Sequence, residues 1–236
     1  MVLISRIFTY FVPLIYLLVG LSWLIHSGWV FYGSALVILL LMASIYSISG
    51  QTGGIRTFLF ELIYPLFTQI IGLAFLVFIP KNWLYVIVVI FFSTMLFLIL
   101  NESFNRHHPF LGKSFDFNIK LQTVLIITLS FFIAVIGYSF ILYINWPLWL
   151  VILLFIILIS LLLLRLHGYN RKLEFLLVDI AVIALTLELF FILHYLPMDI
   201  YLKSLIVSSN LFIIFSYIVN KEFYKINNQY GLKEKN

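Results

Sequence analysis

Residues Trp83 to Leu100 read WLYVIVVIFFSTMLFLIL, a run without a single charged side chain. A helix needs roughly 20 mostly apolar residues to cross the hydrocarbon layer of a bilayer. Pro80-Lys81-Asn82, which directly precedes the run, interrupts an earlier apolar stretch and predicts a turn. The run therefore predicts a transmembrane helix that begins at a tight turn, and the rest of the chain repeats this pattern.

The composition of the whole chain supports the same prediction. Of the 236 residues, 64% are hydrophobic and 10% are charged, whereas a soluble domain averages about 25% charged residues. Too few polar residues remain to cover a soluble core, so we expect most of the surface to face membrane lipids. The basic residues lie in short loops between apolar runs, which indicates membrane orientation signals and no nucleic-acid partner.

Eight apolar stretches are long enough to be membrane spans. They cover residues 7–25, 29–49, 58–79, 83–100, 119–143, 146–165, 173–196 and 198–219. We therefore expect an all-α fold, a polytopic membrane helical bundle of about eight transmembrane helices that forms one integral membrane domain over residues 1–236. Only a polar loop over 101–118 and a cytoplasmic tail over 221–236 are expected to lie in water, which leaves no room for a soluble catalytic domain.

The distribution of basic residues predicts the orientation of the bundle. With the N-terminus inside and eight spans, all but two of the 14 Lys and Arg residues fall on the cytoplasmic side, as the positive-inside rule requires. The tryptophans fall at outer helix ends, where aromatic belts form: Trp23, Trp29, Trp83, Trp146 and Trp149. The pattern predicts a multi-pass membrane protein with both termini in the cytoplasm.

A faint tandem repeat relates the two halves of the sequence. One constant offset in residue number aligns similar residues: Trp29 with Trp146, Pro80 with Pro197 and Asn82 with Asp199. Two explanations stand. A duplication would relate a four-helix half over 1–118 to another over 119–220 by an axis along the membrane normal, whereas a strongly biased composition also produces chance matches.

Carboxylates inside the predicted spans are the first candidates for function, because a charge in the bilayer costs several kcal/mol unless it is paired or hydrated. Glu61 and Asp179 each lie within two turns of a cytoplasmic helix end. Each either belongs to an ion, proton or substrate site or is an interfacial acid near basic residues. The nearby basic residues are Arg56 for Glu61, and Arg165 and Lys172 for Asp179.

Glu188 lies near the middle of a predicted span, and no Lys or Arg of the same helix lies at its depth. Its candidate partners are His194 and Lys203, which lie toward the outer surface. One interpretation is that Glu188 lines a polar cavity and binds a proton, a cation or a polar group. The other is that a protonated Glu188 hydrogen-bonds neighbouring helices. Asp179 faces the opposite side of this helix, so the two acids do not form a pair.

Two prolines inside spans predict kinks. Pro65 cannot donate a hydrogen bond to the carbonyl of Glu61, and a carbonyl freed beside a carboxylate is able to coordinate a cation. Proline kinks are also ordinary in membrane helices, and Pro13 predicts a kink only. His107 and His108 fall in the predicted loop, and adjacent side chains point apart, so we expect no metal site there.

Known catalytic motifs are absent from the sequence. It contains no Gly-x-Ser-x-Gly elbow, no His-Glu-x-x-His zinc pair and no nucleotide-binding loop. Cysteine is absent as well, which excludes cysteine-based metal sites. We therefore expect no metal, no cofactor and no enzymatic activity, although a new kind of site would not be recognised by these motifs.

The stretch Glu188-Leu-Phe-Phe-Ile-Leu-His-Tyr-Leu-Pro197, followed by a polar turn and a last apolar helix, resembles a family of small eight-helix membrane proteins. This family is a domain of unknown function from candidate-phylum bacteria. The resemblance covers mainly the last two helices, together with the overall length and helix count. It implies eight helices and a bacterial inner membrane, and it implies no activity.

Two functions from different classes fit these observations. The first, which we favour, is transport or permeation of a small solute or ion that uses the intramembrane carboxylates. The second is a non-catalytic membrane subunit or scaffold that packs against a second copy or another membrane protein. A lipid-modifying enzyme has the least support, because no reactive group of residues is visible.

Overall fold

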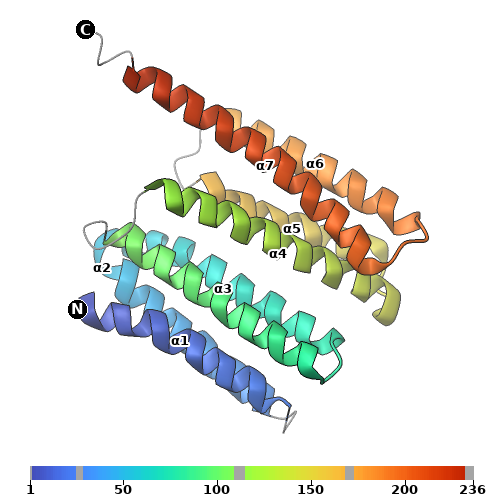
Figure 1. The fold of residues 1–236 in the computed structure, drawn as a ribbon, viewed down its shortest axis with the longest axis horizontal. Helices are drawn as coiled ribbons and strands as arrows, with labels where there is room; N and C mark the ends of the chain where they lie inside the picture. Colours follow the sequence, from blue (N-terminus) through green and yellow to red (C-terminus); the bar gives the residue numbers. More distant parts are fainter. Residues whose placement is uncertain (1, 25–28, 109–114, 168–172, 232–236) are drawn as a thin grey trace. The chain divides into compact units, whose positions relative to one another are not determined.

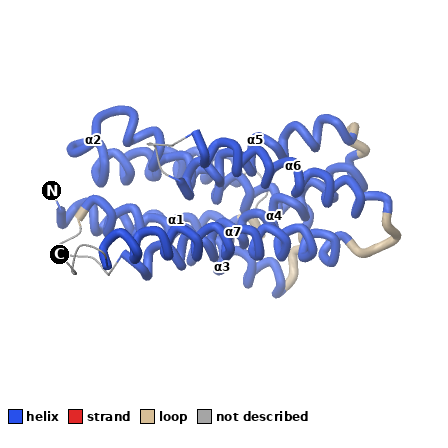
Figure 2. The backbone as a smooth tube through the Cα atoms, turned by 90° about the horizontal axis from the view of Figure 1, so that it is seen from above, coloured by secondary structure: helices blue, strands red, loops and turns tan. Residues whose placement is uncertain are grey.

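The computed structural model describes residues 2–24, 29–108, 115–167 and 173–231, and these ranges are helical with short connections (Figures 1 and 2). No strand occurs in the part of the chain that the structure describes. The predicted all-α fold is therefore confirmed.

The chain divides into two compact units, Met1–Ile119 and Lys120–Asn236. Unit 1 contains α1 (Val2–Ser22), α2 (Trp29–Phe78) and α3 (Trp83–His107), and α4 (Phe115–Ile144) crosses the boundary. Unit 2 continues with α5 (Leu148–His167), α6 (Leu173–Tyr195) and α7 (Ile200–Gly231). The boundary lies next to the junction of the two predicted repeat halves, while a duplication of one half into the other stays a prediction.

Helix α2 consists of two apolar segments joined at Gly54. The backbone at Gly54 has φ 69 and ψ −172, a conformation open to glycine and rarely adopted by other residues. The segments Tyr32–Ser49 and Gly54–Phe78 are each long and apolar enough to cross a membrane. Because α2 packs against both α1 and α3 (Figure 1), the break lets one continuous helical stretch supply two spans of unit 1.

Six helical segments of the described chain are long and apolar enough to cross a membrane. Besides the two segments of α2, they are Leu3–Ser22, Trp83–His107, Val124–Ile144 and Leu177–Tyr195. The apolar parts of α5 and α7, Leu148–Leu163 and Ile200–Ile214, are shorter. The positions of all these segments follow the eight predicted spans, as expected for a multi-pass membrane protein.

The helices extend further into the polar segments than the sequence predicts. Helix α3 continues to His107, so the predicted loop over 101–118 is wrong for its first part, and α4 already begins at Phe115. Helix α7 likewise runs to Gly231 through most of the predicted tail. The prediction ended each span where charged residues begin, but a helix satisfies its own backbone hydrogen bonds in water as well as in lipid.

The helices of unit 1 approach one another closely. The Tyr85 hydroxyl of α3 donates to the Gly20 carbonyl of α1 at 3.0 Å, and Ser93 donates to the Pro13 carbonyl at 2.7 Å. A Cβ atom at Gly20 would lie 2.6 Å from a methyl carbon of Val89. Small residues and carbonyl-directed hydroxyls of this kind bring membrane helices together, and here they fix α1 against α3.

The centre of unit 2 is aromatic. The ring of Phe190 in α6 stacks on Tyr138 of α4 with 4.2 Å between centroids and lies 4.7 Å from the Phe155 ring of α5. The Tyr138 hydroxyl donates to the Phe190 carbonyl at 3.0 Å. Lys203 of α7 places its ammonium group 5.6 Å from the Tyr138 ring centroid. Phe190 and Tyr138 therefore connect side chains from all four helices of this unit.

Candidate functional site

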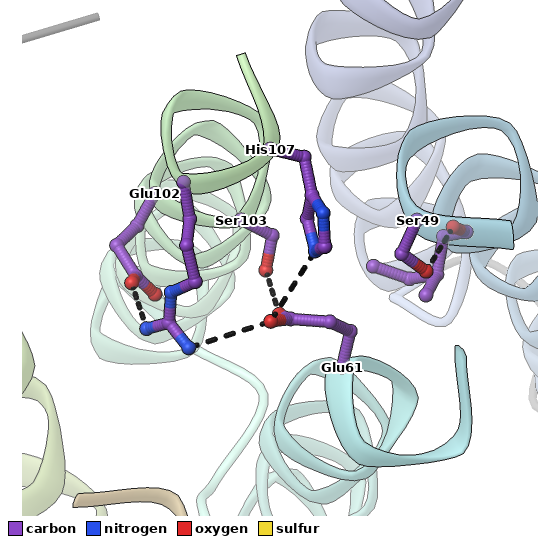
Figure 3. Close-up of polar contacts among 7 residues, drawn as sticks. Ser49, Glu61, Glu102, Ser103 and His107 are labelled. Atoms are coloured by element: carbon purple, nitrogen blue, oxygen red, sulfur yellow. Dashed lines mark hydrogen bonds and ion pairs between the residues drawn. The ribbon is translucent and has the colours of Figure 1, made fainter. Parts of the chain in front are cut away.

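Charged and polar side chains of α2 and α3 gather in the interior of unit 1 (Figure 3). We call this group the Glu61 cluster, and it consists of Glu61, Glu102, Ser103, Arg106 and His107. Glu61 lies in the second segment of α2, and the other members lie in the last two turns of α3. It joins groups of opposite charge from two helices, so we take it as the candidate site.

Both oxygens of the Glu61 carboxylate have partners. The Ser103 hydroxyl donates to Oε2 at 2.7 Å, and Arg106 Nη1 donates to Oε1 at 3.4 Å. The imidazole Nε2 of His107 lies 3.6 Å from the same Oε1. Arg106 also donates through Nη2 to Glu102 Oε1, so one guanidinium group serves two carboxylates (Figure 3).

Helix periodicity explains why these residues meet. Glu102 and Arg106 are four residues apart in α3, as are Ser103 and His107, and such pairs lie on one side of a helix. Glu61 is about two turns beyond Gly54, where the second segment of α2 starts beside the end of α3. The turn at Gly54 therefore places Glu61 opposite the polar side of α3.

The carboxylates of the cluster are buried, and the groups that neutralise them reach the surface. Glu61 and Glu102 are 2% and 1% exposed, whereas the Arg106 side chain is 34% exposed. One guanidinium serves both carboxylates, and an imidazole lies beside Glu61. Imidazole and carboxylate are both groups that can bind a proton. The arrangement therefore places two proton-binding groups next to each other.

Arg6 of α1 is the next basic group near the cluster. Its guanidinium carbon lies 5.8 Å from the centroid of the Phe104 ring, which belongs to the same turn of α3 as Ser103. This geometry is that of a cation over an aromatic face. Among the described residues Arg6 has no ion pair, so it contributes positive potential and no direct contact to Glu61.

Glu61, one of the candidate acids, is buried, and its ion-pair partner is Arg106. The sequence analysis had placed Arg106 in a loop. Arg56, the neighbour expected for Glu61, is exposed. His107 was also assigned to that loop, and this prediction is wrong, because its imidazole lies against the buried Glu61 carboxylate. Among the described residues, three metal-binding side chains do not come together anywhere.

The other predicted acids lie in unit 2. Asp179 is 4% exposed in α6, and the side chains of Arg165 and Lys172, its expected neighbours, lie outside the described residues. Glu188 is exposed on the surface of α6, away from the side that carries Asp179. The two acids therefore have different surroundings, as their positions on the helix predict.

His194 and Lys203, the expected partners of Glu188, interact elsewhere. The Lys203 ammonium group donates to the His194 backbone carbonyl at 3.0 Å and lies over the Tyr138 ring. The His194 ring contacts Tyr195 edge-on, 5.0 Å between centroids. In the described part of the chain, Glu188 has no hydrogen bond or ion pair with either of them.

The predicted kink residues lie inside helices. Pro65 is buried in the second segment of α2, one turn after Glu61, and Pro13 is buried in α1. The Pro13 carbonyl accepts the hydroxyl of Ser93, which makes this proline part of the contact between α1 and α3. The kinks themselves and cation binding by the Glu61 carbonyl stay predictions.

Sequence analysis did not select Glu102, Ser103 or Arg106 as site residues. The signal was present in the spacing of Glu102 and Arg106, since Glu and Arg four residues apart stabilise a helix. It was overlooked because the span was ended at Leu100, where the apolar run ends. The buried acid on α2 and the cation on α3 would have paired once α3 was extended.

Comparisons of this chain with protein families, with curated proteins and with solved structures gave no match. The functional argument therefore starts from the geometry of the Glu61 cluster.

Proposed function

We propose that this chain is a multi-pass protein of a bacterial inner membrane that moves a proton or another small ion or solute across the bilayer, with the Glu61 cluster as its ion site. The observation that carries the proposal is the burial of Glu61 beside Ser103, Arg106 and His107. Ionisable groups held inside membrane helices at a cost of several kcal/mol commonly mark ion pathways and proton relays.

The groups around Glu61 favour a proton over a metal ion as the cargo. The guanidinium of Arg106 already lies 3.4 Å from Glu61 Oε1, so a metal ion at this oxygen would be repelled. A proton avoids this conflict because His107 or the carboxylate itself can hold it.

The side of the membrane that feeds the site follows from the proposed orientation. With both termini in the cytoplasm, the end of α3 faces the cytoplasm, and Arg106 and His107 lie at that end. The partly exposed Arg106 side chain marks the route by which water reaches the cluster. The resemblance to eight-helix bacterial membrane proteins supports this location and adds no mechanism.

Flux measurements on the full chain in liposomes test the proposal. We expect proton flux, read by a pH-sensitive dye inside the vesicles under an imposed membrane potential, to exceed the flux of protein-free vesicles. Glu61→Gln should reduce the flux to the protein-free level, because it removes the charge that attracts the ion and keeps the size of the side chain. Osmotic swelling with small neutral solutes and potassium or sodium loading extend the same assay to other cargo.

Glu188→Gln is the matched control for Glu61→Gln. The substitution is chemically identical, but Glu188 is exposed and lies in the other unit. If Glu61→Gln is well folded and its flux equals that of the wild type, a transport role of the cluster is refuted. Loss of flux in Glu188→Gln alone would move the site to α6.

A non-catalytic subunit or scaffold is the second candidate, and the surroundings of Glu188 favour it. Glu188 lies on a side of α6 whose other members are exposed and apolar: Ala181, Ala184, Leu185, Phe191, Ile192 and Tyr195. A carboxylate on a lipid-facing helix surface is costly, and a partner helix that hydrogen-bonds it would remove that cost. The chain has no cysteine, so oxidative crosslinking of an Ala184→Cys variant in membranes tests this candidate, and absence of any crosslinked product would count against it.

A further inference from the structure

A second group of buried polar side chains lies in unit 1, apart from the Glu61 cluster. It comprises Tyr16 of α1 and Gln69 of α2, which are 3% and 1% exposed. Gln69 is about two turns beyond Glu61 along α2, so the group lies deeper within the predicted span. The sequence analysis selected neither residue as a candidate. Neither makes a hydrogen bond with the Glu61 cluster.

Each of these side chains carries a buried atom without a hydrogen-bond partner among the described residues. For Tyr16 this atom is the hydroxyl oxygen, and for Gln69 it is Oε1. The amide nitrogen of Gln69 is satisfied, because it donates to the Ser34 carbonyl at 3.1 Å. Inside a bilayer such an atom is strongly destabilising when it stays unpaired, so each of the two atoms needs a hydrogen-bond partner.

Gly72 places the Tyr16 hydroxyl against the same part of α2 that carries Gln69. A Cβ atom at Gly72 would lie 2.5 Å from the Tyr16 hydroxyl oxygen, so this hydroxyl occupies the space beside Gly72 that any larger residue would fill. Gln69 lies three residues before Gly72, and Cβ positions with this spacing are about 5–6 Å apart on one side of a helix. The Gln69 side chain can therefore reach toward the Tyr16 hydroxyl along the surface of α2.

Neighbouring polar side chains are already satisfied. The Thr68 hydroxyl donates to the Tyr64 carbonyl at 3.0 Å, and Ser93 donates to the Pro13 carbonyl. The Tyr85 hydroxyl donates to the Gly20 carbonyl. The hydroxyl hydrogens of these groups are committed to backbone carbonyls, so none of them is left to donate to Gln69 Oε1. The Tyr16 hydroxyl makes no hydrogen bond with a described residue.

We propose that Tyr16 and Gln69 form a binding site for one small hydroxyl-bearing molecule, held beside Gly72 between α1 and α2. The Tyr16 hydroxyl donates to the oxygen of this molecule, whose own hydroxyl hydrogen is donated to Gln69 Oε1. Water and the alcohol group of a small solute share this chemistry. The site does not depend on ion movement through the Glu61 cluster, so either can exist without the other.

A double-mutant cycle on the full chain in detergent tests the site. Tyr16→Phe and Gln69→Met each remove one hydrogen bond to the shared molecule and leave the opposite group unpaired, so each should lower the midpoint temperature of unfolding. The double variant should be no less stable than the worse single variant, because both substitutions abolish the same bridge. Tyr85→Phe is the matched control, since the Tyr85 hydroxyl bonds a carbonyl directly, and its effect should add to that of Gln69→Met.

Measuring the cycle in plain buffer and with added 1,2-ethanediol distinguishes water from a solute alcohol as the bound molecule. Full coupling in plain buffer, unchanged by the diol, identifies water. Coupling that rises to saturation with the diol identifies a solute alcohol. Purely additive effects in both buffers, or a higher midpoint temperature for Tyr16→Phe, would overturn the site. Should Gln69→Met fail to fold, Gln69→Leu replaces it in the cycle, because leucine likewise lacks the Oε1 acceptor.

Discussion

At the scale of single residues, Arg106 is the group on which the charges of unit 1 depend. It contacts both Glu61 and Glu102, whose carboxylates are buried. Arg106→Gln removes this cation from both buried carboxylates, and we expect a loss of about 2–3 kcal/mol in the free energy of unfolding. This is less than for a fully buried pair, because a third of the Arg106 side chain is exposed and screened by solvent. Chemical denaturation in detergent micelles measures the change.

The double variant Glu102→Gln/Arg106→Gln is the control for this prediction. It removes one acid together with the base, so it leaves a single buried carboxylate in place of two and should be more stable than Arg106→Gln alone. Equal stability of the two variants would show that the Glu102 carboxylate costs the fold nothing when Arg106 is absent.

The sequence singled out Glu61 as a candidate but not the residues around it, for a physical reason. A carboxylate within an apolar run is visible one residue at a time. Its partners come from another helix, and nothing in the run around Glu61 states which one. Gln69 and Tyr16 were missed for the same reason, since uncharged polar residues are common in membrane helices and only the packing shows which of their atoms are unpaired.

At the scale of helices, two polar residues cap helix starts in the same way. Asn82 Oδ1 accepts the backbone N–H of Leu84 at 3.0 Å, and Asp199 Oδ2 accepts that of Tyr201 at 3.0 Å. The predicted repeat aligns Asn82 with Asp199, and both residues cap the start of a helix. An N-cap of this kind satisfies an N–H group that the helix itself leaves free.

We predict that Asn82→Ala and Asp199→Ala each destabilise the protein by about 1 kcal/mol, the usual cost of losing an N-cap. Asn82→Asp and Asp199→Asn should keep nearly full stability, because each restores an accepting oxygen. Thermal unfolding of the four variants in detergent measures these effects. A loss at one position only would count against an equivalent role in the two units.

Helix ends were the part of the fold that sequence predicted least well. The starts of α3 and α7 follow proline turns and were placed within two residues. Their ends were placed too early, because hydropathy reports where a helix leaves lipid and not where its hydrogen bonding stops. The extra turns of α3 are the ones that carry the Glu61 cluster, so this error hid the site.

At the scale of the whole molecule, the topology predicts which turns can be reached from each side of the membrane. Ile55 and Lys81 are exposed at opposite ends of the second segment of α2. In the cysteine-free chain, Lys81→Cys should react with a membrane-impermeant maleimide on intact cells, whereas Ile55→Cys should react only after permeabilisation. The reverse pattern would invert the orientation, and labelling of both from outside would show that this segment does not cross the membrane.

The positions of the helices were predictable because most of the described spans carry their own signal of about 20 apolar residues. The division into two units was suggested only by the alignment of a few residues, among them the two cap positions. Nothing in the composition of one span reveals which other span it packs against. The packing of one span on another depends on features such as Gly20 and Gly72, where a larger residue would collide with a side chain of a neighbouring helix.

The closure of unit 1 within the first half of the chain has a consequence for biosynthesis. Every member of the Glu61 cluster and of the Tyr16 and Gln69 pair precedes residue 119, where the first unit ends. Domains generally fold as units, N-terminal first, while the ribosome is still at work. The charged centre of this protein can therefore assemble in the membrane while the second unit is still being translated, so its acids need not wait for later helices to be shielded from lipid.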